Sequence, residues 1–312
     1  MHAITQNATH EWSFASRRTY ADPFNDVQLD VVFSDEQGGS YRVPAFWAGG
    51  NVWRVRFSSP DCGIYTFRTV CSDESDTDLH GIEGQFIVTP YTGQNELLRR
   101  GPVRVAADKR HFEHADGTPF FWLADTEWMG LCSRLEWPHD FQTLTSDRAR
   151  KGFSVIQIVA GPYPDMPLND PRGANEAGFP WQDDLSAINP AYYDMADRRI
   201  QHIVSLGIVP CIVGCWGYYM HELGKDRIRK HWRNLIARYG AYPVIWCAAG
   251  EATMPFYTYA GDRAEYDKRV RTQWTEIVRY IRATDPFKRI VGIHPTNSGH
   301  KEVDDASVLD FD

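Results

Sequence analysis

The sequence predicts two domains, an all-β sandwich over residues 1–95 and an α/β domain of the (β/α)8 barrel type over residues 96–312. In the first part, apolar residues alternate with polar ones, which is typical of half-buried antiparallel strands. In the second part, short apolar runs alternate with segments of helical periodicity, which is typical of a parallel sheet covered by helices. The length of 312 residues suits two domains or one large one.

The sandwich is predicted from two alternating segments, 27–33 and 53–57, and from the turn-forming residues between them. The number of strands and the spacing of turns suit a small sandwich of immunoglobulin type, although the Cys…Trp…Cys spacing of true immunoglobulin domains is absent. We expect residues 91–102 to form a linker. A hairpin should follow it, with a tight turn at Asp116-Gly117.

The second domain is predicted to alternate strands with helices. Strands are expected at 120–125, 153–159, 208–213, 244–250, 289–294 and 308–311. Helical segments are expected at 138–151, 189–207, 228–239 and 266–285. A closed barrel needs eight strands, so with six visible strands the barrel should be incomplete at the C-terminus, or the sheet should be open. A doubly wound sheet would also suit, but no glycine-rich phosphate fingerprint follows the first strand.

Composition narrows the possible partners. The net charge is −8 and no basic cluster is longer than two residues, which argues against nucleic acid and anionic membranes. No apolar run reaches the roughly 18–20 residues that span a bilayer, and the first residues do not resemble a signal peptide. The six cysteines lack zinc-binding spacing. We therefore expect free thiols in a cytoplasmic protein, with no metal and no cofactor.

The stretch 244–254 contains the main candidate for a catalytic residue. Apolar and small residues run without polar interruption into one carboxylate, Glu251, as in a strand that is buried on both faces. In (β/α)8 barrels the catalytic groups sit at the C-terminal ends of the strands. Glu251 is therefore a candidate catalytic residue. The alternative is a charged residue that merely begins a surface loop.

Four motifs of the second domain can be compared, in their order, with known proteins. They lie at 117–128, 151–157, 189–193 and 238–251. Together they resemble apiosidase-like glycoside hydrolases, that is, glycoside hydrolase family 140 and its relatives. The first 90 residues resemble the β-sandwich domain that often precedes such barrels.

The resemblance implies a (β/α)8 barrel with two catalytic carboxylates and no metal. Glu251, after the fourth strand, would be the general acid/base, and the nucleophile would follow the seventh strand, beyond Asp312. Related barrel glycosidases often carry Asn before the acid/base residue, whereas Gly250 stands at that position here.

Other residues at the predicted strand ends are candidates for binding a sugar. Asp125 and Glu127 end the first strand, although Asp125 could instead cap the following turn. Gln157 could hydrogen-bond the sugar or satisfy a neighbour in the core. Trp216 could be a stacking platform or simply pack, and His294 could bind sugar or be structural.

Aromatic residues are numerous in the chain, with 11 Trp, which suits a carbohydrate site as well as an ordinary core. In the long loop 161–188, Tyr163 and Trp181 are expected to wall the substrate. Trp246 and Phe256 are expected to lie near Glu251, where an apolar environment would help a carboxylic acid to keep its proton.

The sequence thus predicts a glycoside hydrolase that cleaves a terminal or branching sugar from a plant or bacterial glycan, with retention of configuration. The alternative from another class is an inactive carbohydrate-binding or scaffold protein on the same fold, since one catalytic carboxylate is visible. A lyase or transferase on this scaffold is a third interpretation. The expected partner is a carbohydrate, and homo-oligomers are possible.

Overall fold

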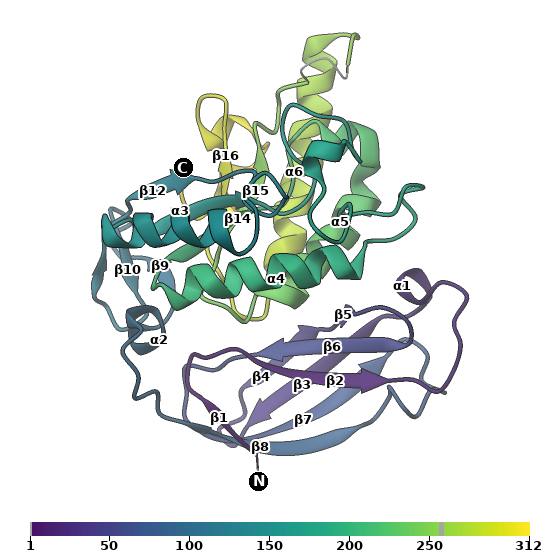
Figure 1. The fold of residues 1–312 in the computed structure, drawn as a ribbon, viewed down its shortest axis with the longest axis vertical. Coiled ribbons are helices and arrows are strands. Elements are labelled where there is room, and N and C mark those ends of the chain that lie inside the picture. Colours follow the sequence, from purple (N-terminus) through teal and green to yellow (C-terminus); the bar gives the residue numbers. More distant parts are fainter. Residues whose placement is uncertain (1, 256–258) are drawn as a thin grey trace.

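The computed structural model describes residues 2–255 and 259–312 and shows a β-sandwich beneath an α/β part (Figure 1). Two sheets form the sandwich, one in the order β1-β8-β7-β3-β4 and one in the order β2-β6-β5. The strands are β1 His2–Thr5, β2 His10–Ala15, β3 Leu29–Asp35, β4 Ser40–Pro44, β5 Phe46–Trp47, β6 Val52–Phe57, β7 Gly63–Cys71 and β8 Glu83–Thr89, and one short helix, α1, spans Pro23–Asp26.

The core of the sandwich comes from the alternation that the sequence shows. Val31 and Phe33 of β3 face Val55 and Phe57 of β6 and are buried, and the rings of Phe33 and Phe57 stack with centroids 4.2 Å apart. The two predicted strands of this part are therefore confirmed. The immunoglobulin type and the boundary at residue 95 stay predictions.

The segment expected to be a linker contains a short helix, α2 Glu96–Arg100, which begins where the side chain of Asn95 accepts a hydrogen bond from the backbone N–H of Leu97. A three-stranded antiparallel sheet follows. Its strands are β9 Val103–Val105, β10 Phe112–His114 and β11 Pro119–Phe120. The predicted hairpin is thus present, with one more strand than expected.

The α/β part is a five-stranded parallel sheet in the order β12-β13-β14-β15-β16, covered by helices (Figure 1). Its strands are β12 Ala124–Thr126, β13 Val155–Val159, β14 Val209–Val213, β15 Ile245–Gly250 and β16 Val291–His294. Its helices are α3 His139–Arg150, α4 Pro190–Ser205, α5 Tyr219–Tyr239 and α6 Arg263–Thr284, with short 3-10 turns η1 Pro171–Gly173, η2 Gly299–Lys301 and η3 Ala306–Val308. Spatial order follows chain order, as repeated β-then-α units predict.

The first predicted strand, 120–125, is wrong in its extent. β11 ends at Phe120, and β12 begins only at Ala124 and is three residues long. Phe121 between them is 78% exposed. The reason is that β12 is hydrogen-bonded on one side only, to β13, so the apolar run is not enclosed as in a central strand.

The sixth predicted strand, 308–311, is also wrong. Residues up to Val308 form the turn η3, and the following residues lie beside β16 without forming a ladder. The Asp310 carboxylate accepts the Val291 N–H at 2.8 Å, and the Asp310 N–H donates to the Val291 carbonyl at 2.8 Å. A side chain thus takes one of the bonds that a strand would have made. Barrel closure stays a prediction.

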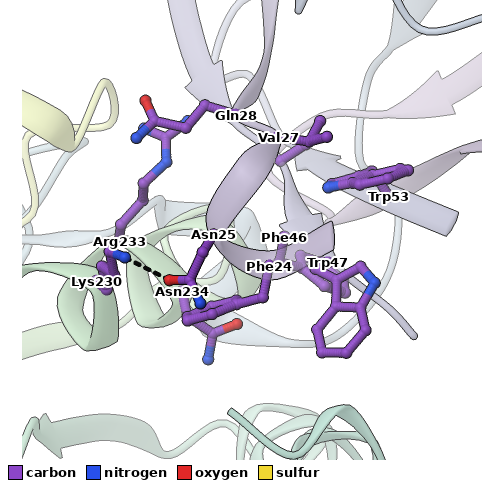
Figure 2. Close-up of a pocket in the computed structure, with 11 residues that line it drawn as sticks. Phe24, Asn25, Val27, Gln28, Phe46, Trp47, Trp53, Lys230, Arg233 and Asn234 are labelled. Atoms are coloured by element: carbon purple, nitrogen blue, oxygen red, sulfur yellow. Dashed lines mark hydrogen bonds between the residues drawn. The ribbon is translucent and has the colours of Figure 1, made fainter. Parts of the chain in front are cut away.

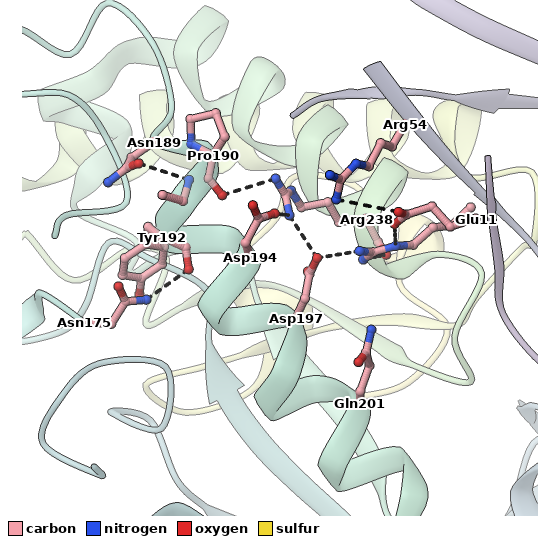
Figure 3. Close-up of polar contacts among 12 residues, drawn as sticks. Glu11, Arg54, Asn175, Asn189, Pro190, Tyr192, Asp194, Asp197, Gln201 and Arg238 are labelled. Carbon is pink, nitrogen blue, oxygen red and sulfur yellow. Dashed lines mark hydrogen bonds and ion pairs between the residues drawn. The ribbon is translucent and has the colours of Figure 1, made fainter. Parts of the chain in front are cut away.

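The sandwich docks on α4 and α5 through buried charges (Figure 3). Asp197 of α4 accepts hydrogen bonds from Arg56 of β6 and from Arg238 of α5, the latter at 3.0 Å. Arg56 also donates to the Arg238 carbonyl at 2.8 Å and to Glu11 at 2.9 Å. Both guanidinium groups lie over the ring of Phe46. The sandwich therefore lies against the helical layer of the α/β part.

The six cysteines are free thiols, of which five are buried and Cys62 is exposed. Among the described residues, no helix is long and apolar enough to cross a membrane. The cytoplasmic location stays a prediction.

Candidate functional site at the end of β15

Glu251 follows the last residue of β15, at the carboxyl end of the parallel sheet. Its backbone has φ 46°, a left-handed conformation that is rare for a residue with a side chain. The Glu251 N–H donates to the His294 carbonyl at 2.6 Å, which ties this turn to the end of β16. Such strained backbone clusters at functional sites. The half-buried carboxyl group is therefore held in place by two neighbouring strands.

Trp216 holds the Glu251 side chain. Its indole Nε1 donates a hydrogen bond to Glu251 Oε2 at 3.2 Å. Trp216 pairs with Gly250 as an extension of the parallel ladder, and its ring covers Gly250. The backbone N–H of Gly217 donates to the Gly250 carbonyl at 2.6 Å. The loop after β14 and the end of β15 are thus joined at the candidate acid.

Three aromatic rings pack together beside this carboxyl group. Trp128 lies 4.9 Å from Trp216 and 5.5 Å from His294, and Trp216 lies 5.6 Å from His294, measured between ring centroids. Burial lowers the pKa of His294, although Glu251 and Glu302 oppose this shift. The lowered pKa favours the uncharged form of the His294 imidazole. We call Glu251, Trp128, Trp216 and His294 the ring cluster.

Gln157 on β13 is joined to the ring cluster by one hydrogen bond. Its Oε1 atom accepts a hydrogen bond from the Trp128 indole Nε1 at 3.1 Å. In the sheet, Gln157 stands beside Thr126 of β12 and Cys211 of β14. The structure thus brings together four of the six residues that the sequence singled out, Glu251, Trp216, His294 and Gln157.

Asp125 and Glu127 line one hollow together with Trp128 of the ring cluster. Asp125 forms an ion pair with Arg148 of α3, which lines the same hollow. Its neighbour Thr126 is in register with Gln157. The predicted roles of Asp125 and Glu127 in sugar binding stay predictions.

Glu127 is a buried acid without a partner. The residue is only 5% exposed. Among the described residues, neither of its carboxyl oxygens has a hydrogen-bond partner. Burial, helped by the nearby Asp125 carboxylate, raises the pKa of Glu127 to about 7, while Arg148 opposes the shift. A carboxyl group in this state can give up or take a proton near neutral pH.

Two hollows meet beside the ring cluster. One, of about 500 Å³, reaches Asp165 in the long loop, and the other, of about 350 Å³, reaches Glu127. Both hollows are lined by Trp128, Met129 and Arg134. Trp128 also belongs to the ring cluster. A ligand that fills either hollow would therefore contact the Trp128 ring, which packs against the ring of Trp216.

The long loop does not supply the predicted walls. Tyr163 and Trp181 are 2% and 1% exposed, respectively, so the prediction that they face substrate is wrong. Tyr163 instead bonds Tyr192 of α4, and Trp181 packs on His231 of α5. The loop folds these large side chains inward, because burying an aromatic side chain removes a large apolar area from water.

The two aromatic residues expected near Glu251 have different outcomes. Trp246 is buried and donates to Asp285 at 2.8 Å, away from the ring cluster. The prediction for Phe256 lies outside the described residues.

Two residues of the site were missed. Trp128 ends the same motif as Asp125, and its position just past a strand end could have indicated it. Glu302 is buried and accepts hydrogen bonds from the Thr253 N–H at 2.6 Å and from the Thr296 hydroxyl at 2.8 Å. It connects the turn after Glu251 to the loop after β16, and nothing in the sequence pattern indicates this.

The parallel sheet with a carboxylate at a strand end places the second part among the α/β catalytic domains that bind ligands at the carboxyl edge of the sheet. Residues 106–312 match the profile of the apiosidase-like catalytic domain, and residues 4–72 match a domain of unknown function, DUF5060. Since the first match spans more than half of the chain, the chain belongs to the apiosidase-like family.

No curated protein matches the sequence. Among solved structures, a provisionally named glycoside hydrolase from Bacteroides vulgatus ATCC 8482 is similar, with 21% identity, a TM-score of 0.71 and coverage of 95% of this chain and 56% of that one. The endo-1,4-beta-mannanase from Rhizomucor miehei shares 16% identity, with a TM-score of 0.50 and coverage of 68% and 67%. At these identities the likeness shows the fold alone. The chain spans 56% of the length of the first structure.

Proposed function

We propose that this chain is the core of a glycoside hydrolase in which Glu251 is the general acid/base. The observation that carries the proposal is the placement of Glu251, held at the carboxyl end of β15 by the Trp216 indole and the His294 carbonyl, among aromatic rings. Rings of this kind stack on the apolar C–H faces of sugars. Membership of the apiosidase-like family supports the same reaction class.

The proposed reaction begins with protonation of the glycosidic oxygen by the Glu251 carboxyl group as the bond to the anomeric carbon breaks. A second carboxylate, which we propose comes from a strand beyond Asp312, attacks the anomeric carbon and forms a glycosyl-enzyme. Glu251, now ionised, takes a proton from the water that cleaves this intermediate. Two displacements give retention, and the two carboxyl groups must then lie about 5–5.5 Å apart.

The substrate that we propose is a terminal or branching sugar of a plant or bacterial glycan. The hollows beside Trp128 provide room for the ring that leaves and for the ring that stays. Aryl glycosides, with apiofuranose and arabinofuranose among them, are the first panel to screen. Homo-oligomerisation and a cytoplasmic location belong to the same proposal.

The leaving group gives the sharpest test of Glu251. Glu251→Gln should lower kcat/KM by about 10²–10⁴-fold for alkyl or phenyl glycosides, whose leaving oxygen needs a proton. The same variant should lose far less on 2,4-dinitrophenyl glycosides, whose leaving group departs without one. Equal losses on both substrates, or near-normal turnover on both, would remove Glu251 from the acid role. Unfolding curves serve as the folding control.

A carbohydrate-binding protein without catalysis is the second candidate. It is favoured by one observation, that among the described residues the ring cluster contains a single carboxylate, Glu251. Binding of the same glycosides without turnover of any of them would decide for this candidate.

A further inference from the structure

A second hollow with ligand-binding chemistry lies away from Glu251, where the sandwich meets α5 (Figure 2). Its walls come from α1 and β5 on the sandwich side and from α5 on the other side. The hollow measures about 50 Å³. It therefore admits one end of a single small molecule and excludes a glycan chain.

Asn234 of α5 lines this hollow and is unsatisfied. The residue is 4% exposed, and among the described residues neither its Oδ1 nor its Nδ2 atom has a hydrogen-bond partner. A buried polar group without a partner is costly, and native proteins rarely keep one unless something else supplies the bonds. The amide offers one acceptor and two donors side by side. It is thus matched to a partner that carries adjacent donor and acceptor groups.

The other walls are aromatic. The rings of Phe24 and Trp47 are half-buried, with centroids 6.2 Å apart, and they line the hollow together with the buried rings of Phe46 and Trp53. The Trp47 indole N–H is already bonded to the Gly50 carbonyl at 2.8 Å. Trp47 therefore offers a ring surface to a ligand rather than a hydrogen bond.

The ammonium group of Lys230 lies at the edge of this hollow. Lys230 lies one helical turn before Asn234, and its ammonium group bonds the side-chain oxygen of Asn25. Among the described residues Lys230 forms no ion pair. The rim can thus donate to a hydroxyl or ring oxygen of a ligand that enters past Asn25.

We propose that this hollow holds the diol edge of a single sugar ring, at a site separate from the ring cluster. Two adjacent hydroxyls of the sugar bridge the Asn234 amide, one donating to Oδ1 and one accepting from Nδ2. An apolar face of the ring lies against Phe24 and Trp47. A sugar ring carries both features that this site needs. Its two adjacent hydroxyls can pair with the amide of Asn234, and its apolar C–H face can pack against the aromatic wall. The proposal does not depend on hydrolysis, since no residue of the ring cluster takes part.

The test uses the full 312-residue chain with Glu251→Gln, so that no probe is consumed. The probes are methyl β-D-glucopyranoside, methyl β-D-galactopyranoside, methyl α-L-arabinofuranoside and methyl β-D-apiofuranoside, observed by ligand-detected NMR titration. For a ligand of this size we expect a Kd on the order of 1 mM. Asn234→Leu and Trp47→Ala, added separately, should each weaken binding of at least one probe about tenfold or more.

Trp128→Ala is the matched control, because it removes a half-buried Trp from the ring cluster and leaves the second hollow intact. A probe whose binding survives Trp128→Ala but is lost in both Asn234→Leu and Trp47→Ala supports the proposal. Because Asn234→Leu changes a buried residue, thermal unfolding verifies each fold, and Trp47→Ala stands as the independent variant. Binding of every probe unchanged in both variants overturns the proposal, as do crystals soaked with the four probes that show only water on Asn234.

Discussion

The indole ring of Trp216 occupies the space in which a side chain on residue 250 would stand. A Cβ atom built on Gly250 would lie 2.3 Å from Cε3 and Cζ3 of that ring. The same ring donates its N–H to Glu251. The glycine before the candidate acid is therefore required by the residue that holds the acid, and this explains why the Asn that is common in related barrel glycosidases is absent.

Gly250→Asn should displace Trp216 and misplace Glu251. Overpacking of this kind costs about 1–3 kcal/mol of unfolding free energy, and the loss of the Trp216 bond should lower kcat as well. Denaturant unfolding and tryptophan fluorescence would measure both effects. The double variant Gly250→Asn with Trp216→Ala relieves the clash, so it should lose less stability than the sum of the two single variants, and it should not recover activity. A single variant as stable as the wild type would contradict the packing argument.

Trp216→Phe keeps an aromatic ring and removes the hydrogen bond to Glu251. Because a hydrogen bond to a charged or ionisable partner is worth about 1.5–3 kcal/mol, kcat should fall about 10- to 100-fold, with a smaller change in KM. Trp128→Phe is the matched control, since the N–H that it removes serves Gln157 instead. Equal effects of the two substitutions on kcat would show that the Trp216 donor has no special role.

Glu127→Gln should change the pH dependence of stability. In the folded protein the pKa of Glu127 is raised to about 7 from the ordinary value of 4.5. The folded state therefore binds the proton more tightly than the unfolded chain, and stability is lost as the pH rises from about 4.5 to about 7. The loss reaches about 3 kcal/mol above that range. Glu127→Gln should equal the wild type near pH 4 and exceed it at pH 8 in urea unfolding; identical curves at pH 8 would refute this.

Asp197→Ala should destabilise the contact between the sandwich and the helices. It leaves Arg56 and Arg238 buried with less negative charge around them, and breaking a buried ion pair costs about 3–5 kcal/mol. Asp78→Ala is the control, because its partner Arg17 is exposed and surface ion pairs contribute little to stability. Thermal unfolding of both variants would compare them, and a similar small shift for both would contradict a structural role of the buried cluster.

Periodicity predicted most of the fold. The stripe Tyr193, Ala196, Ile200 and Ile203 of α4 is buried as expected, and strands β13 to β16 lie where apolar runs indicated. The errors occur at the sheet edges. A hydrophobic run does not reveal how many neighbours a strand will have, so Phe121 was expected to be buried. Equally, the pattern at 308–311 could not show that the Asp310 side chain would take a backbone bond.

The candidate site was predictable in part for similar reasons. Glu251 and Trp216 stand at the carboxyl ends of central strands, whose position follows from the βα order alone. On a short edge strand, however, sequence does not tell which side faces the helices. The sequence therefore could not show that Asp125 would form an ion pair with Arg148 of α3. The isolation of the Glu127 carboxyl group is a tertiary property that no local pattern encodes.

The charge cluster beneath α4 limits how this protein can be dissected. A truncated protein that starts at residue 96 would lack Arg56 and Phe46. The surface of α4 and α5 that these residues cover, including Asp197 and Arg238, would then be exposed to solvent. We expect such a fragment to aggregate. Aggregation of this fragment would reflect the loss of the sandwich against which its helices pack. It would not test whether the α/β part hydrolyses glycosides.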